Sequence, residues 1–119
     1  MINLDNLLNL DAAIRYAAFY LNGVVEMQSK DSVPNQSSSE TDKYEELLVN
    51  PTLLGLAERR GDLDCGGLDY LLVAYGNFFQ YVQRIGQGHV SVCISKESDT
   101  MKIAAKIRIW LRTTAIQER

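Results

Sequence analysis

Residues 68–95 read LDYLLVAYGNFFQYVQRIGQGHVSVCIS and decide the fold class. The stretch contains three runs rich in aromatic and β-branched side chains, which favour strands. Gly76-Asn77 and Gly86-Gln87-Gly88 separate the runs, and both are typical of tight turns. The first run is apolar on both faces apart from Asp69, so we expect helices to cover both faces of the sheet. The pattern predicts an antiparallel meander with strands at 68–75, 78–85 and 89–95.

A second hairpin is indicated near the N-terminus by Asn22-Gly23, because both residues tolerate the positive φ angles of a two-residue turn. Aromatic and β-branched residues flank this turn, so we expect strands at about 12–20 and 24–29. Leucines at helical spacing predict a short helix over residues 3–10 before them. The alanines ahead of the turn favour an alternative, a single helix over 3–20, but the turn signal favours the hairpin.

A helix is predicted in the middle of the chain, at about 41–60. Ser39 or Thr41 would be its N-cap, and acidic residues follow in its first turn, as the helix dipole favours. Asn50-Pro51 interrupts the pattern, because Asn suits an N-cap and Pro suits the first helical position. We therefore expect one kinked helix or two short ones, with Gly61 as the natural end.

The last predicted element is a helix over about 99–114. Its core-facing stripe leaves Ile109 on the polar side, where an isolated exposed isoleucine is ordinary. The stripe consists of Ile103, Ala104, Ile107, Trp110 and Leu111.

Residues 30–40 (KDSVPNQSSSE) are polar, with four Ser and one Pro, and predict a flexible surface loop.

Composition restricts the class of protein. The chain has 119 residues, 46% of them hydrophobic, which predicts one globular domain over 1–119. A net charge of -3 argues against a nucleic-acid or anionic-membrane partner, since both need excess Lys and Arg. The N-terminus lacks the basic region of a secretory signal, and no apolar run is long enough to cross a bilayer. We therefore expect a cytoplasmic protein.

The sequence offers no convincing catalytic or metal site. His89 and Cys93 share a strand face but lie about 13 Å apart at the rise of a strand, too far for base and nucleophile. We interpret His89 as a satisfied structural histidine, although a pairing with Cys65 stays open. One disulfide is possible in principle, but two reduced cysteines fit an intracellular protein better. The acidic pair Glu45-Glu46 is explained by the helix start. We expect no enzyme, no cofactor and no metal.

The predicted order is αββαβββα, a single mainly antiparallel five-stranded α+β sheet. This order resembles the Roadblock family, which includes Roadblock-type dynein light chains and bacterial regulators of Ras-like gliding-motility GTPases. The resemblance is carried by Leu68–Phe78, by Gly88–Ile94 with the helix of Lys102–Leu111, and by the Asn22-Gly23 hairpin. The long loop at 30–40 and Pro51 depart from the family pattern. Longin-like, profilin-like and PAS-like domains are the alternative folds.

The resemblance implies a homodimer in which the strand at 68–75 pairs with its copy and the middle helices pack on each other. It further implies a non-enzymatic adaptor that binds a small GTPase or a motor or signalling assembly. A flat apolar edge strand needs a cover, which agrees with self-pairing. The alternatives are that these residues form the core of a monomer, or that the protein is a small-molecule sensor with a pocket between sheet and helix. The implied interface residues are Tyr44, Leu47, Leu48, Leu53, Leu54, Leu68, Tyr70, Leu72 and Ala74.

Overall fold

The structure, a computed structural model that describes residues 2–30 and 38–117, is built on one five-stranded antiparallel sheet. The strands lie in the order β2-β1-β5-β4-β3, so β2 and β3 are the edges. Both predicted hairpins and the predicted meander are confirmed. The strands are β1 (Ile14–Leu21), β2 (Val24–Ser29), β3 (Leu71–Ala74), β4 (Phe78–Ile85) and β5 (Gly88–Ser95).

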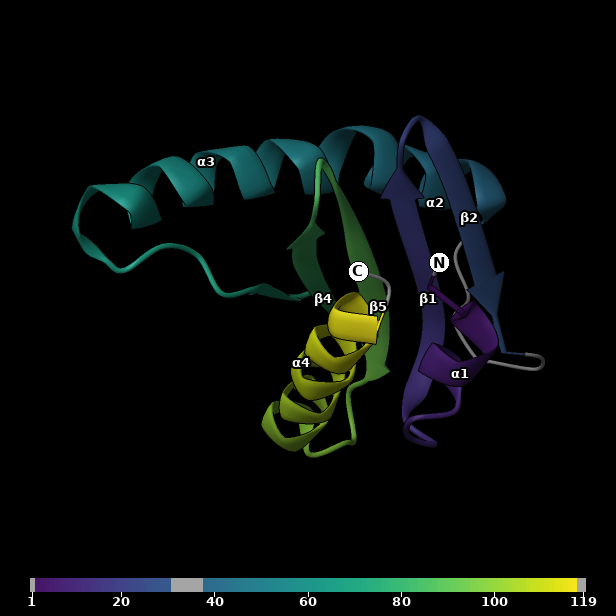
Figure 1. The fold of residues 1–119 in the computed structure, drawn as a ribbon. Coiled ribbons are helices and arrows are strands. Elements are labelled where there is room, and N and C mark those ends of the chain that lie inside the picture. Colours follow the sequence, from purple (N-terminus) through teal and green to yellow (C-terminus); the bar gives the residue numbers. More distant parts are fainter. Residues whose placement is uncertain (1, 31–37, 118–119) are drawn as a thin grey trace.

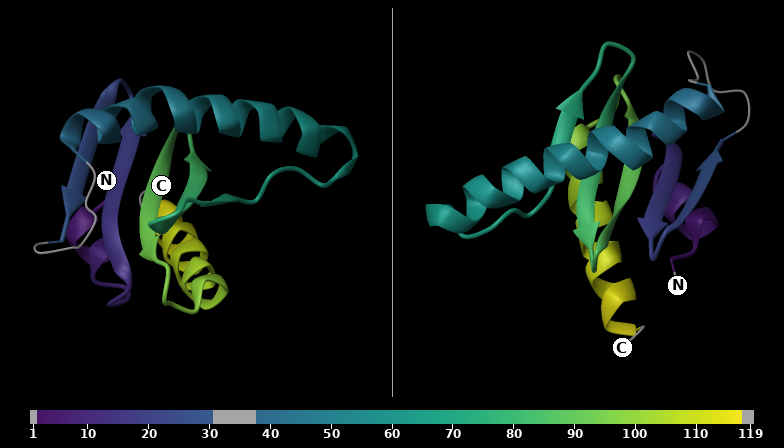
Figure 2. Two further views of the ribbon diagram at one scale, coloured as in Figure 1. Left: turned by 180° about the vertical axis from the view of Figure 1, so that it is seen from behind. Right: turned by 90° about the horizontal axis from the view of Figure 1, so that it is seen from above.

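Helices cover both faces of the sheet, as expected (Figure 1). α1 and α4 lie on one face. α2, the π-helical segment η1 and α3 follow one another without a break across the other face (Figure 2). The last turns of α3 extend past the β3 edge, and the chain returns from there to enter β3 (Figures 1 and 2). The helical segments are α1 (Leu4–Leu8), α2 (Ser39–Tyr44), η1 (Glu45–Val49), α3 (Asn50–Asp64) and α4 (Thr100–Gln117).

The hydrophobic core lies between the sheet and the helices α1 and α4. Leu7 of α1, Phe19 of β1 and Val92 of β5 are all buried there. The predicted stripe of α4 is confirmed in this core, with Trp110 only partly buried, and Ile109 is exposed as expected. Burial of this apolar layer is the main source of stability, because each large side chain removed from water contributes about 1.5–3 kcal/mol.

The first hairpin turn has the conformation that its sequence predicts. Asn22 and Gly23 have φ angles of 54° and 79°, and Leu21 pairs with Val24 across the turn. Both positive φ values are those of a type I′ turn, which matches the twist of the two strands. α1 ends at Leu8, so the alternative of one helix over residues 3–20 is wrong.

Pro51 is accommodated by a π-turn and does not begin a separate helix. The Asn50 N–H donates to the carbonyl of Glu45, five residues back, and Asn50 has α-helical angles of φ -62° and ψ -47°. Proline has no N–H, and its ring crowds the carbonyl four residues before it. The wider π-turn that precedes it relieves this crowding. The prediction that Asn50 is an N-cap is therefore wrong, and the helix passes through the proline.

Both ends of this helical segment differ from the prediction. Its N-cap is Ser38, whose Oγ accepts from the Thr41 N–H at 3.2 Å. The helix also passes Gly61 and ends at Asp64. Gly61 is buried where α3 meets the returning chain, so a close approach explains this glycine better than a helix end.

The predicted loop at 30–40 is described only at its ends. Residues 31–37 lie outside the described residues, and helix α2 already includes the last two positions, Ser39 and Glu40. Among the described helices, none combines the length and the apolar character that a membrane crossing requires.

A pair of glycine substitutions tests the close packing of α3. A Cβ added at Gly61 would lie 2.9 Å from the backbone carbon of Gly67, whereas one at Gly55 would meet nothing within 4 Å. We expect Gly61→Ala to lower the free energy of unfolding by about 1–3 kcal/mol, as overpacking does. Gly55→Ala should be neutral or stabilising by up to about 1 kcal/mol, because alanine favours helix. Urea denaturation measures both, and equal effects would contradict the packing described.

Candidate functional site

The segment α2-η1-α3 faces its own sheet with an unusually polar stripe. Glu46, Asn50, Leu54 and Gly61 are all buried, and they recur at intervals of four, four and seven residues, which places them on one side of the helix. Only one of the four is a large apolar residue. A helix normally turns its apolar side to the core, so this segment is inverted relative to an ordinary amphipathic helix.

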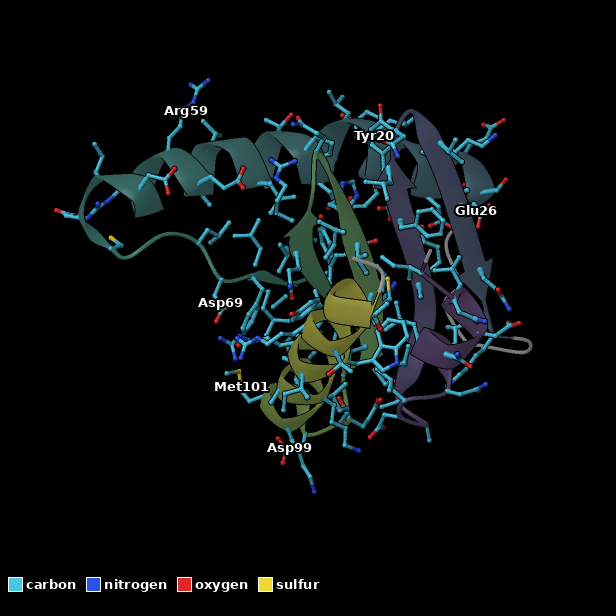
Figure 3. All side chains as sticks on the ribbon, in the orientation of Figure 1. Tyr20, Glu26, Arg59, Asp69, Asp99 and Met101 are labelled. Carbon is cyan, nitrogen blue, oxygen red and sulfur yellow. The ribbon has the colours of Figure 1, made fainter. Side chains whose placement is uncertain are left out.

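The opposite side of the same segment carries the large apolar residues. Tyr44, Leu48, Leu56 and Leu63 have exposed fractions of 60%, 51%, 60% and 79%, and we call these four residues the outer stripe. Arg59 lies on the same side and points away from the sheet (Figure 3). Single exposed leucines are ordinary, but a row of them along one helix indicates a surface that binds another molecule.

The helical residues predicted at the dimer interface have different environments. Tyr44, Leu47 and Leu48 are exposed, and Leu53 is partly buried. Leu54 is fully buried within the single chain, so it belongs to the packing of α3 on its own sheet and has no surface to offer. The prediction missed Leu56 and Leu63, which continue the exposed row. The seven-residue interval between Leu56 and Leu63 was readable, but the π-turn at Glu45–Val49 changes the side of the helix on which they lie relative to Tyr44.

The strand residues predicted at the interface lie at or beside the open edge of β3. Leu68, Tyr70 and Leu72 are partly buried, and Ala74 is exposed. Tyr70 stacks on Tyr81 with ring centroids 4.9 Å apart, and Leu72 packs against the core. Leu68 and Tyr70 precede the strand, which is shorter than predicted and begins at Leu71.

The β3 edge lacks the charges that usually protect a free edge strand. Its sequence, LLVA, contains no charged residue, whereas the other edge strand, β2, carries Glu26 (Figure 3). The nearest charge, Asp69, precedes the strand and is paired with Arg108 of α4 at 2.8 Å between Oδ1 and Nε. An unprotected apolar edge is a template for pairing with another strand.

Below η1, the carboxylate of Glu46 is fully buried and accepts four hydrogen bonds. Its Oε2 accepts from Ser91 Oγ at 2.7 Å and from Tyr16 Oη at 2.9 Å. Its Oε1 accepts from Asn50 Nδ2 at 3.1 Å and lies 2.8 Å from His89 Nε2. Four partners are what a buried carboxylate needs to offset its lost hydration. We call Glu46 and these four partners the Glu46 cluster.

The Glu46 cluster corrects one interpretation and confirms another. The sequence explained Glu45-Glu46 by the helix start, and for Glu46 this is wrong, because the side chain is 0% exposed and bonded to β1 and β5. His89 is a satisfied structural histidine, as predicted. Burial, reinforced by the neighbouring Glu46 carboxylate, raises the pKa of Tyr16, so its hydroxyl stays a donor.

The cysteines are not placed for nucleophilic chemistry. Cys93 is buried, and its thiol donates to Gln80 Oε1 at 2.9 Å, while burial raises the pKa of that thiol. Cys65 is exposed at the end of α3, where it donates to Asp64 Oδ1 at 3.3 Å. Over residues 2–30 and 38–117, no three His, Cys, Asp or Glu side chains are grouped to hold a metal ion.

Comparison with solved structures identifies the fold. The chain is similar to a Roadblock/LC7 domain from Streptomyces avermitilis, with 13% identity over 94% of this chain and 93% of that one and a TM-score of 0.66. It is similar to MglB in a tetrameric arrangement, with 16% identity, coverage of 94% and 82%, and a TM-score of 0.68. It is also similar to MglC from Myxococcus xanthus, with 13% identity over 95% of this chain and 90% of that one and a TM-score of 0.54.

These similarities show that the chain has a Roadblock fold, which confirms the predicted resemblance and fold class. No protein-family model and no curated protein matches the sequence.

Removal of the Glu46 carboxylate tests whether the cluster holds the helix on the sheet. We expect Glu46→Ala to lower the free energy of unfolding by about 3–5 kcal/mol, because it leaves four buried polar groups without their shared partner. Glu46→Gln keeps the shape of the side chain but turns an amide N–H group toward donors. Its free energy of unfolding should lie between those of the wild type and Glu46→Ala.

The exposed Glu40→Ala is the matched control and should change stability by less than about 0.5 kcal/mol. Guanidinium denaturation followed by circular dichroism compares the variants. A Glu46→Ala protein as stable as the control would show that the cluster contributes nothing.

Proposed function

We propose that this chain is a non-enzymatic cytoplasmic regulatory or adaptor protein that acts as a homodimer and binds a Ras-like small GTPase or a related signalling partner. The observation that carries the proposal is the inverted helix, which uses polar and small residues against its own sheet and leaves the outer stripe in solvent. An exposed apolar row is unfavourable in water, and it becomes favourable when another molecule covers it.

Self-association is supported by the β3 edge and the overhanging end of α3. Two β3 strands pairing about a two-fold axis would continue the sheet from one chain into the next and remove both open edges. The end of α3 extends past β3 and would lie over the partner's sheet (Figure 1). The MglB structure in a tetrameric arrangement shows that a protein of this fold self-associates.

The outer stripe is then the surface for a second kind of protein. It faces away from the sheet, so strand pairing at β3 does not have to cover it. A row of aromatic and leucine anchors with an adjacent arginine, here Arg59, is a composition typical of protein interfaces. A Ras-like GTPase is the partner class that the family resemblance implies.

A proline in β3 tests the proposed strand pairing. Hydrogen-bonded and non-bonded pairs alternate in an antiparallel ladder, and the Tyr75 N–H donates to the Phe78 carbonyl at 2.9 Å. The next residue pair is Ala74 with Phe79, so the Ala74 N–H points to the open edge. Ala74→Pro therefore removes a donor that only a partner strand would use. We expect a dimer near 27 kDa, twice the 13.4 kDa chain, to become a folded monomer in sedimentation velocity.

Val25→Pro is the matched control at the other edge. By the same alternation, the Lys30 N–H bonds to Arg15, so the Val25 N–H also points outward, but from β2. This variant should stay dimeric. A wild-type chain that is strictly monomeric at micromolar concentration would sink the proposed self-association.

Two charged substitutions in the outer stripe test partner binding separately from dimerisation. Leu56→Asp with Leu63→Asp should abolish retention of a small GTPase in a pull-down from the source cell, loaded with GDP or with a GTP analogue, because desolvated aspartates oppose an apolar contact. Ile109→Asp on α4 is the control, since Ile109 is 61% exposed and Leu56 is 60%. Mass spectrometry identifies the retained proteins. Loss with Ile109→Asp but not with the double variant would place the partner on the opposite face.

A further inference from the structure

A cavity of about 320 Å³ lies between the sheet and the start of the α2-η1-α3 segment, next to the Glu46 cluster. It is lined by residues of β1, β4 and β5 on one side and by residues of α2 and η1 on the other, the β3–β4 turn forms a third wall, and the remainder is open to solvent. Its volume is at the lower end of the range of sites that bind small molecules. A molecule with a single ring would fit. The residues used below are Tyr16, Glu45, Tyr75, Phe78, Gln80 and Cys93.

The wall of this cavity contains a buried amide that is only half satisfied. Gln80 is 1% exposed, and its Oε1 accepts from the Cys93 thiol at 2.9 Å. Its Nε2 is buried and has no hydrogen-bond partner among the described residues. A buried donor without a partner is costly, and because Gln80 lines the cavity, a rotation of its amide toward an acceptor placed there would recover that free energy.

The opposite wall contains a carboxylate that is weakly held. Glu45 is partly buried, and its two oxygens accept only from the Tyr75 hydroxyl, at 3.2 and 3.4 Å. Burial raises the pKa of Glu45 although the Tyr75 hydrogen bond lowers it. The neighbouring Glu46 already accepts from four groups and is saturated. Glu45 is therefore the carboxylate that a ligand would reach.

The remaining walls favour a flat ligand. Tyr16, Tyr75 and Phe78 line the cavity, and the rings of Tyr75 and Phe78 lie 5.5 Å apart. None of the lining residues that the structure describes is a lysine or arginine, while Asp42 adds a further carboxylate. Arg15 does not line the cavity itself but lies against two residues that do, with its guanidinium 5.7 Å from the Phe78 ring and Nη1 3.2 Å from the Asn77 carbonyl. Aromatic faces with carboxylates are a setting that binds organic cations.

We propose that this cavity binds a small flat organic cation that also carries a carbonyl-type acceptor. The ammonium or amidinium group pairs with the Glu45 carboxylate, the acceptor takes the free N–H of Gln80, and the aromatic side chains enclose the ring between them. Every residue that the structure describes as lining the site belongs to one chain. It therefore does not depend on the proposed dimer or on a protein partner.

The test uses three probes of one shape, titrated into the full chain at neutral pH by calorimetry and by amide chemical shifts. 4-(Aminomethyl)benzamide carries both recognised groups, benzamide lacks the cation, and 4-carbamoylbenzoate carries an anion in its place. We expect binding in the order cation, neutral, anion, with about tenfold or more between the first and the last. Chemical-shift changes should centre on residues 41–46, 75–80 and 93.

Variants of the two recognising residues complete the test. Glu45→Gln keeps the shape but removes the charge, and Gln80→Leu keeps the volume but removes the amide. Each should weaken the cation by about tenfold. Glu26→Gln, an exposed carboxylate on β2, is the matched control and should bind as the wild type does. The Ala74→Pro chain should also bind as the wild type does, which separates this site from self-association.

Two results would overturn the proposal. One is absence of binding by the cationic probe up to about 10 mM, which would leave ordered water as the occupant that satisfies Gln80. The other is binding of all three probes with equal affinity and without dependence on Glu45, which would show an apolar pocket with no charge recognition.

Discussion

The burial of one carboxylate organises the polar face of this protein. Glu46 lies under the helix with four hydrogen-bond partners from β1, β5 and the helix itself. A buried charge is tolerated only when its bonds are made, so the position of the helix is determined by polar geometry. The opposite face of the sheet is held by ordinary apolar packing with α1 and α4. The two faces of the sheet are thus held mainly by different kinds of interaction, one polar and one apolar.

The inverted helix follows from that constraint. Because Glu46 and Asn50 must point inward and Gly61 must fit against backbone, the inward side has little room for leucines. Apart from Leu54, which is buried, the leucines of the segment therefore lie on its flanks and outer side. The π-turn at Glu45–Val49 adjusts the two halves of the helix, so that Glu46 and Asn50 face the sheet together even though a proline follows. An exposed apolar row is a consequence of a polar interior contact.

The sequence was sufficient for elements whose signal is local. Asn22-Gly23 specified the first hairpin by its φ preferences, and alternation with glycine turns specified the meander. It was insufficient where the decisive partner lies far along the chain. Glu46 reads as an acid near a helix start until Ser91, 45 residues away, is placed beside it. Gly61 reads as a helix end until the chain returns to touch it. Spacing alone also could not show the phase change of a π-turn.

Separation along the sequence also explains why the candidate surfaces were only partly predicted. An edge strand has a partner strand on one side only. The position of β3 at an edge was predictable because consecutive hairpins place β3, β4 and β5 side by side in chain order. The cavity is different, since η1, β1, β4, β5 and a turn all contribute to it. Gln80, which carries the half-satisfied amide, lies between Phe79 and Tyr81 in β4, and nothing in this sequence pattern distinguishes it from an ordinary strand residue. Only the folded chain shows that Gln80 and Glu45 line the same space. The two buried side-chain atoms without a hydrogen-bond partner among the described residues, Asn50 Oδ1 and Gln80 Nε2, both belong to the polar side of this domain, and that is the side on which we propose a binding site.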